Sequence, residues 1–173
     1  VELLWDIANT LRISEFKSAP LYGVGTDDSH EYHGRPGSRP GRGWIMVRSR
    51  FLTPEHLIRA INVGDFYASS GVTLTDLNFD AESQTLTIGI QGEAGVKYRT
   101  DFIGTKIDYD KTSQPRRGKD GEELVSTRKY STEVGQTLHS VEEKLAQYKL
   151  TGRELYVRAV ITANRPVDDP AFA

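Results

Sequence analysis

One short segment of the sequence brings together two side chains of the kinds that bind metal ions. Asp28 and His30 are separated by a single residue, Ser29. In an extended backbone, residues i and i+2 point to the same side, so the carboxylate and the imidazole can meet at one point. Carboxylate and imidazole together suit Zn, Mn or Fe, which activate water for hydrolysis. The spacing therefore predicts Asp28 and His30 as metal ligands at the end of a strand.

The same segment has a second interpretation. Asp often opens a turn by accepting hydrogen bonds from nearby backbone, and a surface His can simply stand beside such a turn. Two neighbours extend the metal hypothesis, because Asp27 and His33 could orient the ligands through hydrogen bonds. His33 could also complete an Asp-His-His site, and Asp27 could instead bond the backbone of the turn.

The number of available ligands limits this site. A catalytic zinc site takes about three protein ligands, and a two-metal site takes more. The remaining histidines are His56 and His139, and the sequence contains no His-x-His pair. Most other ligands would therefore come from additional sequence. The chain begins at Val1, not Met, and enters a helical pattern at once, which indicates a piece of a longer protein.

A basic loop follows the metal-binding candidates. The stretch 34–43 contains four Gly, two Pro and three Arg, a composition that does not form a regular element. A guanidinium group can hold a phosphate or carboxylate in a bidentate manner. We single out Arg42, beside Trp44, as the candidate substrate-binding residue. A solvated loop would equally explain Arg42 and the other two arginines, Arg35 and Arg39.

Alternating helices and strands are expected to position the candidate metal ligands. Residues 1–16 carry an apolar stripe at helical spacing, formed by Leu4, Ile7 and Leu11. Residues 21–25 are predicted as a short buried strand that leads directly into the candidate ligands.

A second strand and helix are expected after the loop. Residues 44–48 are predicted as a strand. A helix is predicted between Thr53 and Gly64. Thr53 can act as its N-cap, Pro54 suits the first helical position, and Gly64 can end the helix.

From residue 66 onward, alternating runs predict an all-β region. Short apolar–polar alternation separated by turn residues is typical of an antiparallel β-sandwich. The stretch 110–121 is predicted as a long exposed loop. The expected strands cover 72–79, 85–90, 96–103, 123–130, 144–150 and 155–162.

Composition limits the possible functions. The chain has 173 residues and a net charge of −2, which gives no electrostatic footprint for broad nucleic-acid binding. No apolar run approaches the roughly 20 residues that span a bilayer, so we expect no membrane partner. The absence of Cys excludes disulfides and thiolate chemistry but fits either redox compartment, so it leaves localisation open.

Several motifs together resemble a known family. Five segments are similar to the C-terminal portion of proteins in a bacterial subgroup of the PHP superfamily, the polymerase-and-histidinol-phosphatase-like metallohydrolases. These segments are the run from Leu21 to His33, the block 40–48, and the stretches 52–55, 64–71 and 152–159. The resemblance implies a distorted α/β barrel, up to three divalent metals, and hydrolysis of a phosphate ester or related bond by metal-activated water. It implies Asp28 and His30 as ligands.

The expected organisation combines both lines of reasoning. Residues 1–70 are predicted as the C-terminal segment of a TIM-like PHP barrel, 71–165 as a β-sandwich, and 166–173 as a tail, an α+β class overall. The resemblance implies a phosphorylated or related small-molecule substrate and, as partner, the N-terminal barrel of the same chain. The fragment alone is then an incomplete enzyme. The alternative is a non-catalytic binding or structural module, for example one that binds carbohydrate.

Overall fold

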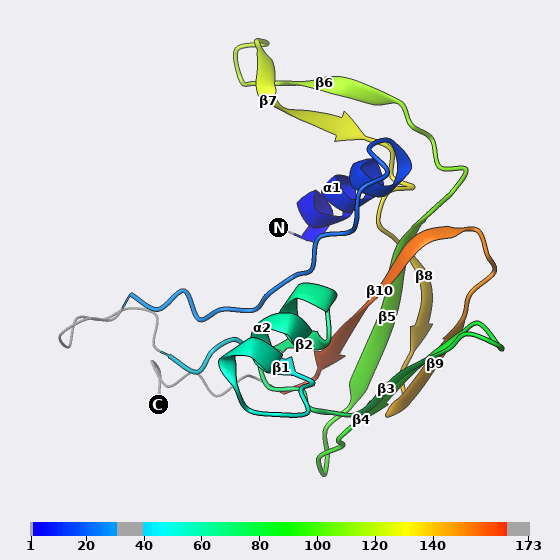
Figure 1. Ribbon diagram of the computed structural model, residues 1–173. Coiled ribbons are helices and arrows are strands. Elements are labelled where there is room, and N and C mark those ends of the chain that lie inside the picture. Colours follow the sequence, from blue (N-terminus) through cyan, green and yellow to red (C-terminus); the bar gives the residue numbers. More distant parts are fainter. Residues whose placement is uncertain (1, 31–39, 166–173) are drawn as a thin grey trace. The chain divides into compact units, whose positions relative to one another are not determined.

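The computed structural model describes residues 2–30 and 40–165. In these residues, two helices and four small sheets form an α+β fold, as the predicted class requires. The elements are α1 (Glu2–Ser14), β1 (Trp44–Val47), α2 (Pro54–Val63), β2 (Phe66–Ser69), β3 (Leu74–Asp80), β4 (Thr85–Ile90), β5 (Tyr98–Lys106), β6 (Ser113–Arg117), β7 (Glu123–Tyr130), β8 (Gln136–Val141), β9 (Leu145–Lys149) and β10 (Glu154–Ala163) (Figure 1).

The strand pairs β1–β2, β4–β9, β5–β8 and β6–β7 are antiparallel, and the described strands form no closed barrel. Neither helix in the described ranges has the length and apolar character to cross a membrane.

The chain forms two compact units, and each is assembled from separated stretches of sequence. Unit 1 contains α1 and most of the strands, and unit 2 contains β1, α2 and β2. The predicted domain boundary between residues 70 and 71 stays a prediction. Unit 1 comprises Val1–Leu21, Asp76–Gly89 and Tyr98–Thr162, and unit 2 comprises Tyr22–Thr75, Ile90–Lys97 and Ala163–Ala173.

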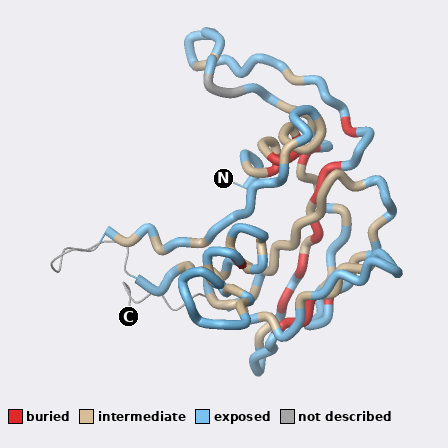
Figure 2. Tube along the Cα trace, viewed as in Figure 1, coloured by how far each residue is buried: buried red, intermediate tan, exposed pale blue. Residues whose placement is uncertain are grey.

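Two three-stranded sheets make up most of unit 1. Their strand orders are β10-β5-β8 and β3-β4-β9. Phe102 of β5 is completely buried and stacks on Tyr148 of β9, with ring centroids 5.3 Å apart. Ile88 and Ala146, opposite each other on β4 and β9, are also buried. Both sheets therefore contribute side chains to the same core, and buried residues follow these strands in Figure 2.

The predicted N-terminal helix is present as α1, but its fully buried face is polar, and in the predicted apolar stripe Ile7 and Leu11 are only half-buried. Asp6, Asn9 and Thr10 are at most 2% exposed, whereas Leu4 is 64% exposed. The physical reason is that the polar groups find strong partners in unit 1. Asp6 forms an ion pair with Arg158 of β10 at 2.7 Å, and a satisfied polar group can be buried at little cost.

The helix α2 follows its sequence signals closely. It begins after Thr53 and ends at Gly64, whose φ of 81° is the left-handed conformation that a helix stop requires. The Thr53 hydroxyl makes no capping bond to the helix backbone and instead lies 2.8 Å from His56 Nδ1. Only Ala60 of this helix is buried, so most of its apolar side chains contact solvent.

Two secondary-structure predictions are wrong. Residues 21–25 form no strand, because no described strand pairs with them. The predicted loop at 110–121 contains β6, which pairs with β7. Most of β6 is exposed, so it needs no alternation of apolar residues, and Pro115 is tolerated because an edge strand can lack one backbone donor. The strands β2 and β8 also lie outside the predicted set.

Candidate functional site

Close backbone contacts within unit 2 hold the segment that carries Asp28. A Cβ atom on Gly25 would lie 3.0 Å from the Trp44 carbonyl oxygen, and one on Gly43 would lie 2.8 Å from that of Thr26. The two glycines therefore allow residues 25–26 to run directly against the start of β1. This packing positions the next residues, Asp27 to His30, without any strand pairing of their own.

Asp28 and His30 come together in the structure. His30 Nδ1 lies 2.6 Å from the backbone carbonyl oxygen of Asp28 and 3.6 Å from its carboxylate oxygen Oδ1. Since a carbonyl only accepts, Nδ1–H is the donor, and Nε2 then carries the lone pair. Both side chains are open to solvent, His30 at 68% and Asp28 at 86%.

The backbone at Asp28 is not extended, which corrects the geometry expected for i and i+2. Its φ is 49°, in the left-handed region that residues other than Gly seldom adopt. This conformation turns the Asp28 carbonyl toward the His30 ring. In the described residues, the Asp28 carboxylate accepts no backbone hydrogen bond, whereas Asp80 and Asp110 each accept one from the residue two positions later.

Asp27 bonds the backbone of the loop that precedes β1. Its Oδ1 accepts the N–H groups of Arg42 at 2.6 Å and Gly43 at 2.7 Å. Backbone hydrogen bonds from Gly43 and Gly41, with the nearby charge of Arg42, lower the pKa of Asp27. The carboxylate therefore fixes the loop close to Asp28.

The other predicted site residues are only partly placed. Arg42 is exposed, and its charge lies near Asp27. His33, predicted to orient ligands, lies outside the described residues, as do Arg35 and Arg39. Across residues 2–30 and 40–165, no group of three or more His, Cys, Asp or Glu side chains is arranged to hold a metal ion. The described site is therefore a pair of potential ligands.

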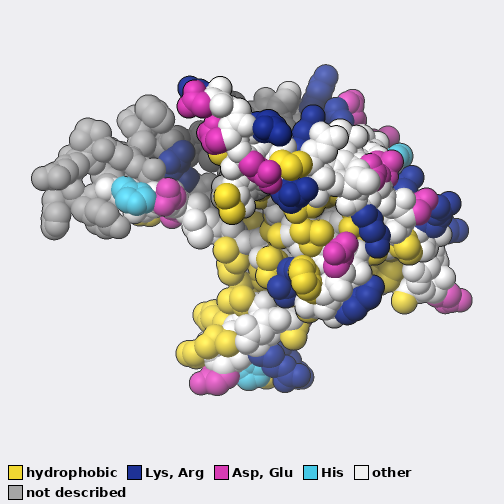
Figure 3. Space-filling view, turned by 90° about the horizontal axis from the view of Figure 1, so that it is seen from above, with side chains coloured by type: hydrophobic (Ala, Val, Ile, Leu, Met, Phe, Trp, Pro, Cys, Tyr) yellow, Lys and Arg dark blue, Asp and Glu magenta, His cyan; other side chains and the backbone are white. Residues whose placement is uncertain are grey.

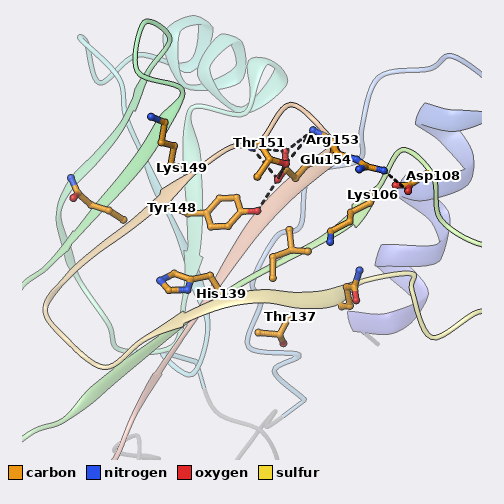
Figure 4. Close-up of a pocket in the computed structure, with 12 residues that line it drawn as sticks. Lys106, Asp108, Thr137, His139, Tyr148, Lys149, Thr151, Arg153 and Glu154 are labelled. Atoms are coloured by element: carbon orange, nitrogen blue, oxygen red, sulfur yellow. Dashed lines mark hydrogen bonds and ion pairs between the residues drawn. The ribbon is translucent and has the colours of Figure 1, made fainter.

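A hollow of about 700 Å³ lies in unit 1, and its lining contains none of the predicted metal ligands and not the predicted substrate contact Arg42. It opens between β8 and β9, which are the outer strands of the two three-stranded sheets. Figure 4 shows its side chains coming from β5, β8, β9 and the start of β10. The ring of His139 lies 6.4 Å from that of Tyr148 on the lining.

A hydrogen-bonded carboxylate closes one end of the hollow. Glu154 Oε1 accepts the Tyr148 hydroxyl and the Thr151 hydroxyl, each at 2.8 Å. Burial acts to raise the pKa of Glu154, but the hydrogen bonds from Tyr148 and Thr151 outweigh it and lower the value. Burial and the same carboxylate raise the pKa of Tyr148 to about 12. Beside them, Arg153 forms an ion pair with Asp108.

Sequence reasoning missed this hollow because its parts are distant in the chain. Tyr148 lies in a predicted strand, where a half-buried Tyr is common, whereas His139 lies in β8, which was outside the predicted strands. The one local signal was the segment 148–154, which brings Tyr, Thr, Arg and Glu together within seven residues. That signal does not indicate which strand faces it.

Comparison with known proteins adds no further constraint on the site. No protein-family model, no curated protein and no solved structure matches this chain.

Proposed function

We propose that this chain is part of a metal-dependent hydrolase of the phosphoesterase type, with Asp28 and His30 as two of its metal ligands. The observation that carries the proposal is the hydrogen bond from His30 Nδ1 to the Asp28 carbonyl. Histidines that bind metals commonly donate one ring N–H to a carbonyl or carboxylate, which fixes the tautomer and leaves the other nitrogen for the metal. Nε2 of His30 and the Asp28 carboxylate are then the available ligand atoms.

The chemistry of this pair fits a divalent ion. One carboxylate and one neutral imidazole suit Zn, Mn or Fe, and such an ion lowers the pKa of a bound water toward neutrality. Asp27 holds the loop at residues 42–43 close to the ligands. Arg42, on that loop, is the proposed contact for a phosphate group of the substrate.

The exposed apolar side chains of unit 2 support its interpretation as one part of a larger barrel. Leu52 is 91% exposed, and Val24, Ile58 and Val63 are each about 60% exposed. Figure 3 shows hydrophobic side chains uncovered on one face of the molecule. Where such side chains gather into a patch, the patch usually marks an interface. We propose that it packs against the N-terminal barrel of the same enzyme.

The same proposal includes a more specific fold, with a barrel segment followed by a sandwich. Residues 1–70 would form the last segment of a PHP-like barrel, and the two three-stranded sheets of unit 1 would form an antiparallel sandwich. The shared core of Phe102, Ile88 and Ala146 supports the sandwich. The barrel segment has weaker support, because β1 and β2 are antiparallel whereas the strands of an α/β barrel are parallel.

The test is a titration of the isotope-labelled chain with Mn²⁺, followed by nuclear magnetic resonance. A paramagnetic ion at the proposed site broadens the resonances of residues 28–30 first. Asp28→Gly combined with His30→Ala removes this broadening, and glycine keeps the left-handed backbone at position 28.

His56→Ala provides the matched control. His56 is also exposed, and its Nδ1 is also hydrogen-bonded locally, to Thr53. This variant is expected to keep the broadening at residues 28–30. Equal broadening in the double variant, or broadening centred on His56, would refute the assignment of Asp28 and His30.

A further inference from the structure

The hollow between β8 and β9 contains a cation that no described acid neutralises. Both acids on its lining already have partners, since Asp108 pairs with Arg153 and Glu154 is held by Tyr148 and Thr151. Within the described ranges, the Lys106 ammonium forms no ion pair or hydrogen bond. In Figure 4, Lys106 extends toward the space between Tyr148 and Thr137. The Lys106 ammonium is therefore available to pair with an anionic group of a ligand in the hollow.

Aromatic rings form one wall of the hollow. Tyr148 and His139 both line it, and each stacks on the buried ring of Phe102, at 5.3 and 6.3 Å between centroids. Because Phe102 is completely buried, it supports the other two rings from inside the core. A supported ring wall favours a ligand with a flat, partly apolar face.

Polar groups surround the rings. Thr137 and Gln136 of β8 contribute a hydroxyl and an amide to the lining. Among the described strands, β8 pairs only with β5 and β9 only with β4, so their outer edges also present backbone N–H and C=O groups. Many donors and acceptors around a ring wall suit a ligand with several hydroxyl groups.

We propose that this hollow binds an anionic saccharide, a sugar ring that carries a carboxylate or a phosphate. The sugar ring lies against Tyr148 and His139, its hydroxyls bond Thr137 and the strand edges, and its acid group pairs with Lys106. The volume of about 700 Å³ is in the range of small-molecule sites and accommodates one or two sugar rings. The proposal does not depend on the metal ligands Asp28 and His30.

An extended peptide paired with the edges of β8 and β9 is the competing occupant. The ring wall and the single unneutralised lysine directed inward favour the saccharide, because a peptide strand needs only the backbone edges. The two occupants give different results in the experiment below.

The experiment is a titration of the isotope-labelled full chain with D-glucuronate, D-glucose 6-phosphate, D-glucose and inorganic phosphate in turn. Glucuronate and glucose 6-phosphate are expected to shift the amide resonances of Lys106, Thr137, His139 and Tyr148. If only one of the two shifts them, that result identifies the acid group. Glucose lacks the acid group that pairs with Lys106, and phosphate lacks the ring that lies against Tyr148 and His139, so each is expected to bind about tenfold more weakly.

Two pairs of variants locate the binding. Lys106→Gln is expected to weaken binding of the anionic sugar about tenfold. Lys149→Gln is the matched control, because Lys149 lines the same hollow but extends away from it in Figure 4. His139→Ala is expected to weaken every sugar, and His139→Phe to restore the ring contact.

Three outcomes would overturn the proposal. The first is the absence of any shift with all four compounds. The second is phosphate binding as strongly as glucose 6-phosphate, which would show a simple anion site. The third is an acidic peptide that protects the outer amides of β8 and β9 from hydrogen exchange while neither acidic sugar binds.

Discussion

The two units of this chain differ in how many apolar side chains they bury. Unit 1 contains most of the buried apolar side chains, including Phe102, Ile88 and Ala146, whereas unit 2 contributes Ala60 and Ile90. Large exposed apolar side chains occur in both units, for example Phe16 at 72% in unit 1 and Leu52 at 91% in unit 2. Fully burying a large apolar side chain stabilises a protein by about 1.5–3 kcal/mol. The comparison indicates that unit 1 supplies most of the stability, and that the proposed metal ligands lie in a unit with little core of its own.

The largest expected effect comes from the core of unit 1. Phe102→Ala removes a fully buried ring that contacts both Tyr148 and His139, and we expect a loss of about 3–5 kcal/mol in the free energy of unfolding. Ile58→Ala in unit 2 is the contrasting variant, because Ile58 is 59% exposed. We expect a change of about 0.5 kcal/mol or less there. Urea denaturation measures both, and equal losses would contradict the comparison.

The buried ion pair of α1 has an expected effect of similar size. Asp6 is 2% exposed and Arg158 is 18% exposed, and the Asp6 carboxylate also accepts the Tyr156 hydroxyl at 2.8 Å. Asp6→Ala leaves a largely buried charge without its main partner, so we expect a loss of about 3–5 kcal/mol. Thermal unfolding measures this loss.

An exposed ion pair of unit 1 is the control for Asp6. Asp108 and Arg153 are 59% and 65% exposed, so Asp108→Ala should cost at most about 1 kcal/mol. A comparable loss from both substitutions would show that burial does not determine the strength of these pairs.

The smallest expected effect is a loss of stability at alkaline pH. Burial raises the pKa of Tyr156 to about 12, from an ordinary value of 10.0, and the Asp6 hydrogen bond also favours the neutral phenol. The folded pKa is above the unfolded one, so this stabilisation is complete below pH 10 and is lost as the pH rises toward 12. A rise from 10.0 to about 12 corresponds to roughly 2.7 kcal/mol at full burial. Solvent screening at the half-buried Tyr156 reduces this, so Tyr156→Phe should remove about 1 kcal/mol of the stability that is lost between pH 10 and 12. Urea denaturation at several pH values tests it, and an unchanged slope would contradict the raised pKa.

Local signals in the sequence were sufficient for several elements. Thr53, Pro54 and Gly64 predicted α2, because the fixed backbone of Pro54 and the left-handed stop at Gly64 depend on neighbouring residues alone, although the Thr53 hydroxyl forms no capping bond. Alternation predicted the bounds of β4 and β7 as the structure has them. The pairing of Asp28 with His30 was also expected, since the two residues are separated by one position, although a left-handed Asp28 produces it and not an extended strand.

The tertiary structure decided the features that depend on distant partners. Asp6 is buried because Arg158, 152 residues later, neutralises it. The hollow exists because β8 and β9 are the outer strands of different sheets, and β6 forms because β7 pairs with it. Periodicity and capping depend on interactions within a few residues, so the sequence by itself determines them. The burial of a polar group depends on the free energy of a long-range pair, which no local pattern contains.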